Sequence, residues 1–142
     1  MFLKELWRRI IKTFSPTSTV RMPQPVLDTD DLLRRVIFTN PSYVRQDLTV
    51  TSFAFTPRKS GGVSERGVSV DISRLTSYGR SIVDRFNYRL YSVKASYVRQ
   101  IGLDCKHNPI EGNEAHALIV GNLKTPNCRK LAHGAVRVPF PD

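Results

Sequence analysis

The chain has 142 residues and a formal net charge of +10, from 22 Lys and Arg against 12 Asp and Glu. This length suits one domain, and 40% hydrophobic residues is too high for a wholly disordered chain. No apolar run approaches the roughly 20 residues of a membrane-spanning helix, and two cysteines are too few for a disulfide scaffold. We therefore expect a basic globular domain with reduced thiols, and a cytoplasmic location.

Residues 1–14 have the pattern of a short amphipathic helix, with apolar side chains at helical spacing and charged side chains opposite. No small-residue cleavage site follows, so we do not expect a secretory signal. A helix this short must bury its apolar side against its own domain, a partner protein or a membrane surface. We expect it to dock on a partner through Phe2, Leu6, Trp7, Ile10 and Phe14.

Residues 15–29 hold three prolines and several Ser and Thr residues, which predicts an extended linker. The folded domain is then expected over residues 30–142. Its first apolar segment, residues 32–37, is either a helix or a strand, because the periodicity does not decide between them.

The next segments alternate between strand and helix patterns. Residues 48–56 and 68–72 each predict a strand, and the two are consistent with a hairpin whose long loop covers residues 57–67. The apolar stripe from Leu75 to Phe86 predicts a helix, although Gly79 weakens it.

The rest of the chain continues this alternation. Residues 89–95 predict a strand, residues 96–102 a short helix ended by Gly102, and residues 115–120 a buried strand. Residues 103–106 predict a short extended segment. Thr125 as cap and Pro126 in the first turn predict the last helix. The sum is a single small α+β domain with a short mixed or antiparallel sheet and two to three helices, preceded by the tethered N-terminal amphipathic helix.

The excess positive charge lies in the middle of the chain. Residues 32–99 carry twelve Lys and Arg against four Asp and Glu, and Arg outnumbers Lys 15 to 7 over the whole sequence. A guanidinium pairs with phosphate through two bonds and stacks on bases, which an ammonium does not do. This composition favours a polyanionic partner, with nucleic acid first.

A basic constellation with interleaved tyrosines is the strongest functional signal. Basic residues flank the glycines of the loop 57–67 and surround the predicted helix 75–86, where a tyrosine beside an arginine suits base stacking. The residues expected to contact nucleic acid are Arg58, Lys59, Arg66, Arg74, Arg80, Arg85, Arg89, Tyr78 and Tyr88.

Motifs for enzymatic chemistry are weak. The sequence has no phosphate-binding glycine motif of a known class, and the late cysteines and histidines lack zinc spacing, so we expect no cofactor and no metal. A Cys-His site built from Cys105 or Cys128 with His116 has no local support. His116 could act as the general base of a nuclease, and it is the alternative catalytic residue.

The order of several short motifs resembles a family of small bacterial proteins whose activity is not established. The family pattern is roughly "AF-P … LSV … GL … NPAHA-I", and the resemblance covers about residues 34–133. The insertion of residues 110–114 splits the NP and HA elements. The motifs that match are Ala54-Phe55-Thr56-Pro57, Val68-Ser69-Val70, Gly102-Leu103-Asp104, Asn108-Pro109 and Glu114-Ala115-His116-Ala117-Leu118-Ile119. The resemblance implies an accessory role in a mobile-element or antiviral-defence system.

These observations favour a non-enzymatic accessory subunit that binds nucleic acid, RNA in preference to DNA, and docks on a partner protein. The alternative is a small nuclease or toxin-like hydrolase centred on His116. A peripheral membrane module anchored by residues 1–14 is the second alternative.

Overall fold

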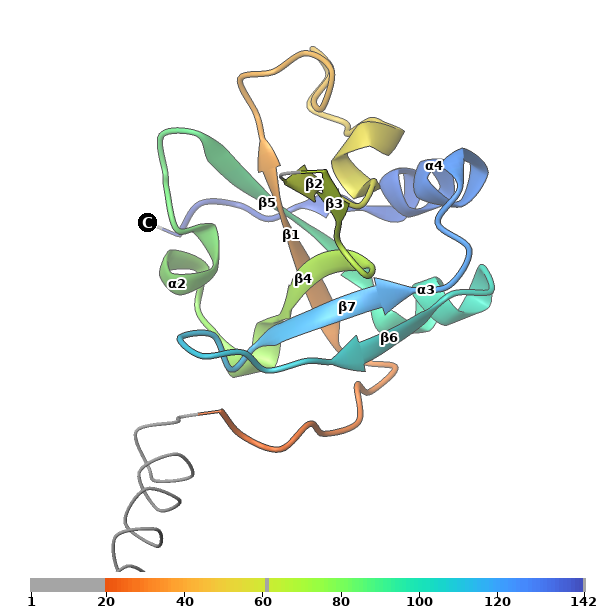
Figure 1. Cartoon of the computed structure of the whole chain (residues 1–142). Coiled ribbons are helices and arrows are strands. Elements are labelled where there is room, and N and C mark those ends of the chain that lie inside the picture. Colours follow the sequence, from red (N-terminus) through yellow and green to blue (C-terminus); the bar gives the residue numbers. More distant parts are fainter. Residues whose placement is uncertain (1–19, 61, 142) are drawn as a thin grey trace, which may run out of the picture.

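The fold is built on a six-stranded sheet in the order β6-β7-β4-β1-β5-β8, in which every neighbouring pair is antiparallel (Figure 1). The structure is a computed structural model that describes residues 20–60 and 62–141, so the predicted docking helix 1–14 lies outside the described residues. The strands are β1 (Asp31–Ile37), β4 (Val68–Ile72), β5 (Tyr88–Lys94), β6 (Asp104–His107), β7 (His116–Val120) and β8 (Val136–Arg137). The sheet and its helices confirm the predicted α+β class.

Helices cover both faces of this sheet. The helices α3 and α4 and the 3-10 turn η1 lie on one face, and α2 lies on the other (Figure 1). A two-stranded hairpin, β2 with β3, precedes β4. The bounds are η1 (Ser52–Phe55), β2 (Lys59–Ser60), β3 (Val63–Ser64), η2 (Ser73–Leu75), α2 (Tyr78–Ile82), α3 (Ala95–Gln100) and α4 (Thr125–Gly134).

The central strand β1 explains why its sequence was ambiguous. Successive side chains of a strand point to opposite faces, and both faces of β1 are covered, so its apolar residues do not alternate with polar ones. Leu32 and Val36 enter the core under α3 and α4, whereas Leu33 enters the cluster under α2. The segment 32–37 is therefore a strand.

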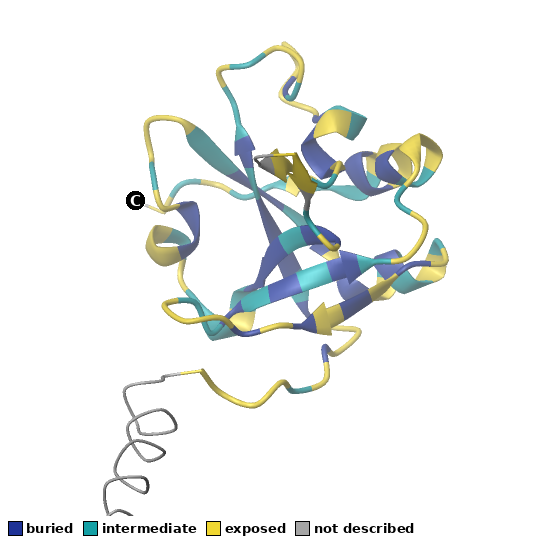
Figure 2. Cartoon of the chain, viewed as in Figure 1, coloured by how far each residue is buried: buried dark blue, intermediate teal, exposed yellow. Residues whose placement is uncertain are grey.

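The main core lies between the sheet and the helices α3 and α4, whose inner sides are buried while their outer sides face solvent (Figure 2). Phe55 of η1, Val98 of α3 and Leu131 of α4 are each fully buried against it. A smaller cluster on the other face joins Leu33, Leu90 of β5 and Ile82 of α2. The C-terminal residues Val138 and Phe140 pack on this second cluster.

The prediction of a strand over 48–56 is wrong. The segment forms the turn η1, in which the consecutive residues Ala54 and Phe55 are both buried, at 4% and 0% exposure. A strand would send these neighbours to opposite faces, so burial of both selects the helical turn. The expected hairpin with β4 is absent too, because β4 pairs with β1 and β7.

The predicted helix over 75–86 is much shorter in the structure. The helix α2 ends at Ile82 because Val83 takes a positive φ of 63°, and Val83 and Phe86 are 73% and 89% exposed. The carboxylate of Asp84 accepts the amide N–H of Phe86 and the side-chain amide of Asn87. This local turn competes with continuation of the helix.

The short strands β2, β3 and β8 were not predicted, whereas the remaining predicted elements agree with the structure. The strands β4, β5 and β7, and the helices α3 and α4, lie within a residue or two of their predicted bounds. Gly102 follows α3 with φ +89°, the conformation that favours glycine at a helix end. Thr125 begins α4 instead of capping it, because Lys124 occupies the cap position.

Residues 24–28 of the predicted linker are attached to the domain. Val26 is buried, the backbone N–H of Gln24 donates to Nδ1 of His107, and Arg99 donates to the carbonyl of Val26 and the carboxylate of Asp28. These contacts tie the entry of the chain to α3 and β6.

Candidate nucleic-acid interface

A groove at the end of β1 brings together three of the residues expected to contact nucleic acid. Its volume is about 340 Å³. Two cations and several aromatic side chains line it together. The residues that matter chemically are Tyr43, Phe53, Thr56, Arg58, Lys59 and Tyr88.

The wall of this groove is held in place by Arg34, a buried arginine of β1 with 1% exposure. Its guanidinium donates to the carbonyl of Ala54 at 2.8 Å, of Thr56 at 3.1 Å and of Ser69 at 2.8 Å. Burial lowers its pKa to about 9, with the nearby charge of Arg58 contributing, so the group stays charged at neutral pH. Arg34 thereby fastens η1 and the residues after it to β4.

The aromatic side of the groove offers faces for stacking. Phe53 is 63% exposed because the turn η1 directs Ala54 and Phe55 into the core and leaves Phe53 outside. Tyr43 and Tyr88 are half-buried at the groove's edges. Exposed aromatic faces of this kind stack unpaired bases.

The cationic side of the groove is exposed. Arg58 and Lys59 both face solvent, and Arg58 uses one N–H on the carbonyl of Arg35. Arg66 is also exposed; it follows Glu65, whose backbone N–H donates to the carbonyl of Arg58 at 2.9 Å. Arg66 therefore lies close to the hairpin without lining the groove.

Other predicted cations have partners inside the protein. Arg74 donates to the carboxylate of the buried Asp30 at 2.7 Å, and to Gln24 and the carbonyl of Pro25. The guanidinium of Arg89 is stacked between the rings of Phe38 and Phe140, at 3.8 and 4.3 Å from their centroids. These arginines stabilise the fold, and their part in nucleic-acid binding stays a prediction.

Arg85, Tyr78 and Arg80 lie further along the face that carries α2. Arg85 is exposed, and its guanidinium is 5.2 Å from the centroid of Phe140. The ring of Tyr78 packs against the same Phe140. Arg80 lines a separate hollow beside α2.

His116, the alternative catalytic residue, opens β7 and is half-buried. Its Nδ1 lies 2.8 Å from the carbonyl oxygen of Asn108, which assigns the Nδ1 proton to that bond. Its Nε2 lies 3.3 Å from the hydroxyl of Ser69 on β4. The ring is thus held in one orientation, with Nε2 placed to accept a proton.

The two thiols do not form a nucleophilic site. Cys105 and Cys128 are free and buried, and burial raises the pKa of both thiols. A thiol with a raised pKa carries little thiolate at neutral pH, and thiolate is the reactive form. Within residues 20–60 and 62–141, no three His, Cys, Asp or Glu side chains gather as a metal site would require.

Sequence reasoning missed Tyr43, Phe53 and Arg35. The expected strand over 48–56 would have placed Phe53 on the same face as the buried Phe55, which hid its exposure. Arg35 directly follows the buried Arg34, and the two differ in role only because successive side chains of β1 point to opposite faces of the sheet. A correct assignment of β1 as a central strand would have distinguished the two.

Comparisons of the chain with protein-family models, curated proteins and solved structures give no match. In the part of the chain that the structure describes, no helix has the length and apolar character needed to cross a membrane.

Proposed function

We propose that this protein binds single-stranded nucleic acid, RNA in preference to DNA, in the groove at the end of β1. The observation that carries the proposal is the pairing, in one groove, of the exposed cations Arg58 and Lys59 with the aromatic residues Tyr43, Phe53 and Tyr88. Cations that follow a backbone and aromatic faces that stack bases are the two parts of single-strand binding sites.

The aromatic residues of the groove favour a single strand over a duplex. Aromatic stacking needs bases that are free of a duplex stack, and protein recognition of RNA is concentrated on such unpaired bases. Each stacked base contributes about 1–3 kcal/mol, independent of its identity. The site therefore supports binding with little sequence preference.

The wider role in this proposal is that of a non-enzymatic accessory subunit in the cytoplasm. The amphipathic pattern of residues 1–14 supports docking on a partner protein, and the buried free thiols Cys105 and Cys128 suit a reducing compartment. Placement in a mobile-element or antiviral-defence system rests on the family resemblance.

The first prediction concerns charge in the groove. The double variant Arg58→Gln with Lys59→Gln should bind a single-stranded RNA about tenfold or more weakly, because two phosphate contacts are lost. The measurement is fluorescence anisotropy of a labelled RNA of about ten nucleotides, titrated at several salt concentrations. The slope of log affinity against log salt should fall by about 1.4, or 0.7 for each contact.

The matched control removes the same charge from α4, a helix that contributes no residue to the groove lining. Arg129→Gln with Lys130→Gln changes two adjacent exposed cations of α4. It should retain wild-type affinity to within a few-fold. If both double variants lose affinity equally, the binding is a diffuse charge effect and the groove is not the site. Tighter binding of single-stranded DNA than RNA would correct the preference.

The orientation of His116 supports a second candidate, the small nuclease. Its Nε2 faces the hydroxyl of Ser69 while Nδ1 is fixed by a carbonyl, an arrangement that suits a general base. The accessory proposal expects no cleavage of labelled RNA by the pure protein. Reproducible cleavage that disappears in His116→Ala, with the fold retained, would replace it with the nuclease.

The peripheral membrane module rests on residues 1–14 and is tested by vesicle flotation. Flotation of the full chain with anionic vesicles, lost on deletion of residues 1–19, would replace the partner-docking role with a lipid anchor.

A further inference from the structure

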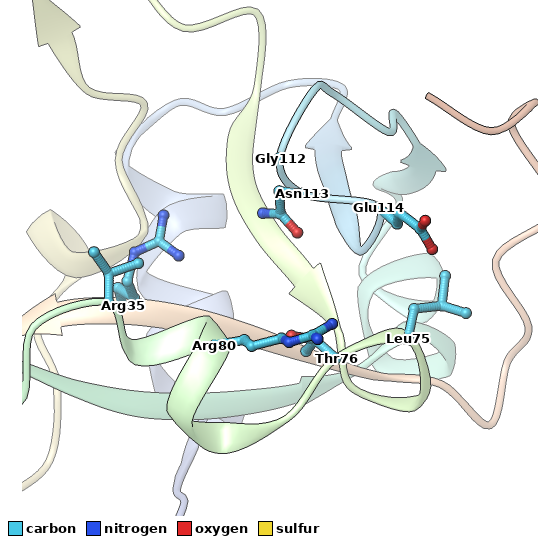
Figure 3. Close-up of a pocket in the computed structure, with 8 residues that line it drawn as sticks. Arg35, Leu75, Thr76, Arg80, Gly112, Asn113 and Glu114 are labelled. Carbon is cyan, nitrogen blue, oxygen red and sulfur yellow. The ribbon is translucent and has the colours of Figure 1, made fainter. Parts of the chain in front are cut away.

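A second hollow, of about 540 Å³, lies between α2 and the loop that joins β6 to β7 (Figure 3). Arg35 and Asn113 point toward one another across it, and Arg80 runs along the α2 side beside Thr76. Its lining includes Arg35, Leu75, Thr76, Arg80, Val83 and Asn113.

Two lining residues of the hollow, Arg35 and Asn113, are held by Asp71, which is 3% exposed. Its carboxylate accepts the hydroxyl of Ser81 at 2.7 Å, the amide of Asn113 at 2.8 Å and the guanidinium of Arg35 at 3.3 Å. These partners come from α2, the β6–β7 loop and β1. Asp71 is thus a positioning residue that fixes the walls of the hollow before any ligand arrives.

Two guanidinium groups keep donors available in this hollow. Within the described residues, Arg35 donates hydrogen bonds only through Nη1, to the carboxylate of Asp71 and to the carbonyl of Ser81. Its Nε and Nη2 groups are therefore free to donate to a ligand. Arg80 is exposed, and its guanidinium has no ion-pair or hydrogen-bond partner within residues 20–60 and 62–141. Glu114 also lines the hollow, and its carboxylate is paired with Arg21 at 3.3 Å.

The rim of the hollow carries backbone strain. Val83 has φ 63° and ψ −53°, a γ-turn closed by the hydrogen bond from Asp84 N–H to the Ile82 carbonyl at 2.6 Å. This conformation is strongly disfavoured for a β-branched residue, and such strain concentrates at functional sites. It holds the Val83 side chain at 73% exposure beside the hollow, where with Leu75 it offers an apolar wall.

The hollow and the aromatic groove are neighbours, because Arg35 lines the hollow and Arg58 of the groove donates to the carbonyl of Arg35. A small cleft lined by Arg35, Tyr43, Phe53 and Arg58 shares its last three residues with the groove. A strand whose bases stack in the groove would therefore have Arg58 and Arg35 close to its backbone, with the hollow within reach of its end.

We propose that this hollow binds the phosphomonoester of a nucleotide, with Arg35 and Arg80 on the phosphate and Thr76 and Asn113 as neutral hydrogen-bonding groups. Guanidinium forks match phosphate oxygens through paired bonds, and the doubly charged terminal phosphate is favoured over an internal diester. The phosphate belongs either to the end of a bound RNA strand, which rests on the proposed function, or to a free nucleoside monophosphate.

The test compares RNAs of about ten nucleotides that differ only in their ends: a 5′-phosphate, a 3′-phosphate or hydroxyls at both ends. Anisotropy titrations with the full chain should show about tenfold tighter binding of one phosphorylated RNA than of the hydroxyl RNA. Arg80→Gln should abolish this ratio, which compares phosphorylated and hydroxyl RNA within the same variant. The matched control Arg129→Gln should keep the ratio.

The outcomes separate the two proposals. Equal affinity for all three RNAs, with RNA binding intact, would overturn the phosphomonoester site at a strand end and leave the groove standing. If no RNA binds, the proposed function fails. Calorimetry with AMP and UMP then tests whether the hollow binds a free nucleotide. Binding of either that is lost in Arg80→Gln but kept in Arg129→Gln supports the free nucleotide. Absence of RNA-end preference together with absence of AMP and UMP binding overturns the inference.

Discussion

At the scale of single residues, neighbouring arginines of one strand have opposite roles. Arg34 points into the main core and donates hydrogen bonds to three backbone carbonyls. Arg35 points to the other face and has N–H groups free to bind a ligand. The buried charge of Arg34 is tolerated because its hydrogen bonds replace those lost with water. Positive charge counted from the sequence therefore overstates the charge that is free to bind a polyanion.

Arg34→Lys should lower the free energy of unfolding by about 2–4 kcal/mol, because an ammonium cannot reach the same three carbonyls in the guanidinium's geometry. Urea denaturation followed by circular dichroism measures this loss. Arg129→Lys, at an exposed position of α4, should change the value by less than about 0.5 kcal/mol. Equal stability of the two variants would mean that the Arg34 bonds do not hold the groove wall.

At the scale of elements, close approach of two strands depends on Gly67, which directly precedes β4. A Cβ at this position would lie 2.4 Å from the carbonyl oxygen of Ile119 in β7. A backbone oxygen cannot move aside as a side chain can, so any larger residue would push β4 from its partner.

Gly67→Ala should therefore destabilise the protein by about 1–3 kcal/mol. Gly79→Ala is the matched control: Gly79 lies in α2, and a Cβ there meets nothing within 4 Å. That variant should be neutral or more stable by up to about 1 kcal/mol, because alanine favours the helix. Thermal melts of both variants measure the difference, and a stable Gly67→Ala variant would contradict the packing described for β4.

The elements also show which features a sequence reveals. The strand β4 and the helix α4 carry local signals that agree with their surroundings, so both were predicted. The turn η1 was missed because burial of Ala54 and Phe55 against α4 outweighs the strand preference of its residues. The groove contains Arg58 and Lys59, which the distribution of charge in the sequence predicts as binding residues. It also contains Phe53, whose exposure depends on the turn η1 and was therefore not predicted.

At the scale of the whole molecule, the chain's entry is fixed by charges distant in sequence. Arg99 pairs with Asp28 and donates to the carbonyl of Val26, and Arg74 donates to the carbonyl of Pro25. Val26 itself is 5% exposed. The folded unit therefore includes part of the segment whose proline content predicts a linker.

Deletion of residues 1–29 should lower the free energy of unfolding by at least about 2 kcal/mol, since the burial of Val26 and the partners of two arginines are lost. Deletion of residues 1–19 should leave it unchanged if this segment serves a partner, as proposed. Denaturant unfolding of both truncations checks the difference. A strongly destabilised 1–19 deletion would show that the segment belongs to the fold and would contradict the docking role.

The most direct test of the central claim is ultraviolet cross-linking of a bound single-stranded RNA that carries 4-thiouridine, with the attached residues identified by mass spectrometry. Bases stacked in the groove lie against aromatic rings, so the account predicts cross-links at Tyr43, Phe53 or Tyr88. These cross-links should weaken in the Arg58→Gln with Lys59→Gln variant and persist in the control variant of α4. Cross-links confined to α3 and α4, which contribute no residue to the groove lining, would contradict it.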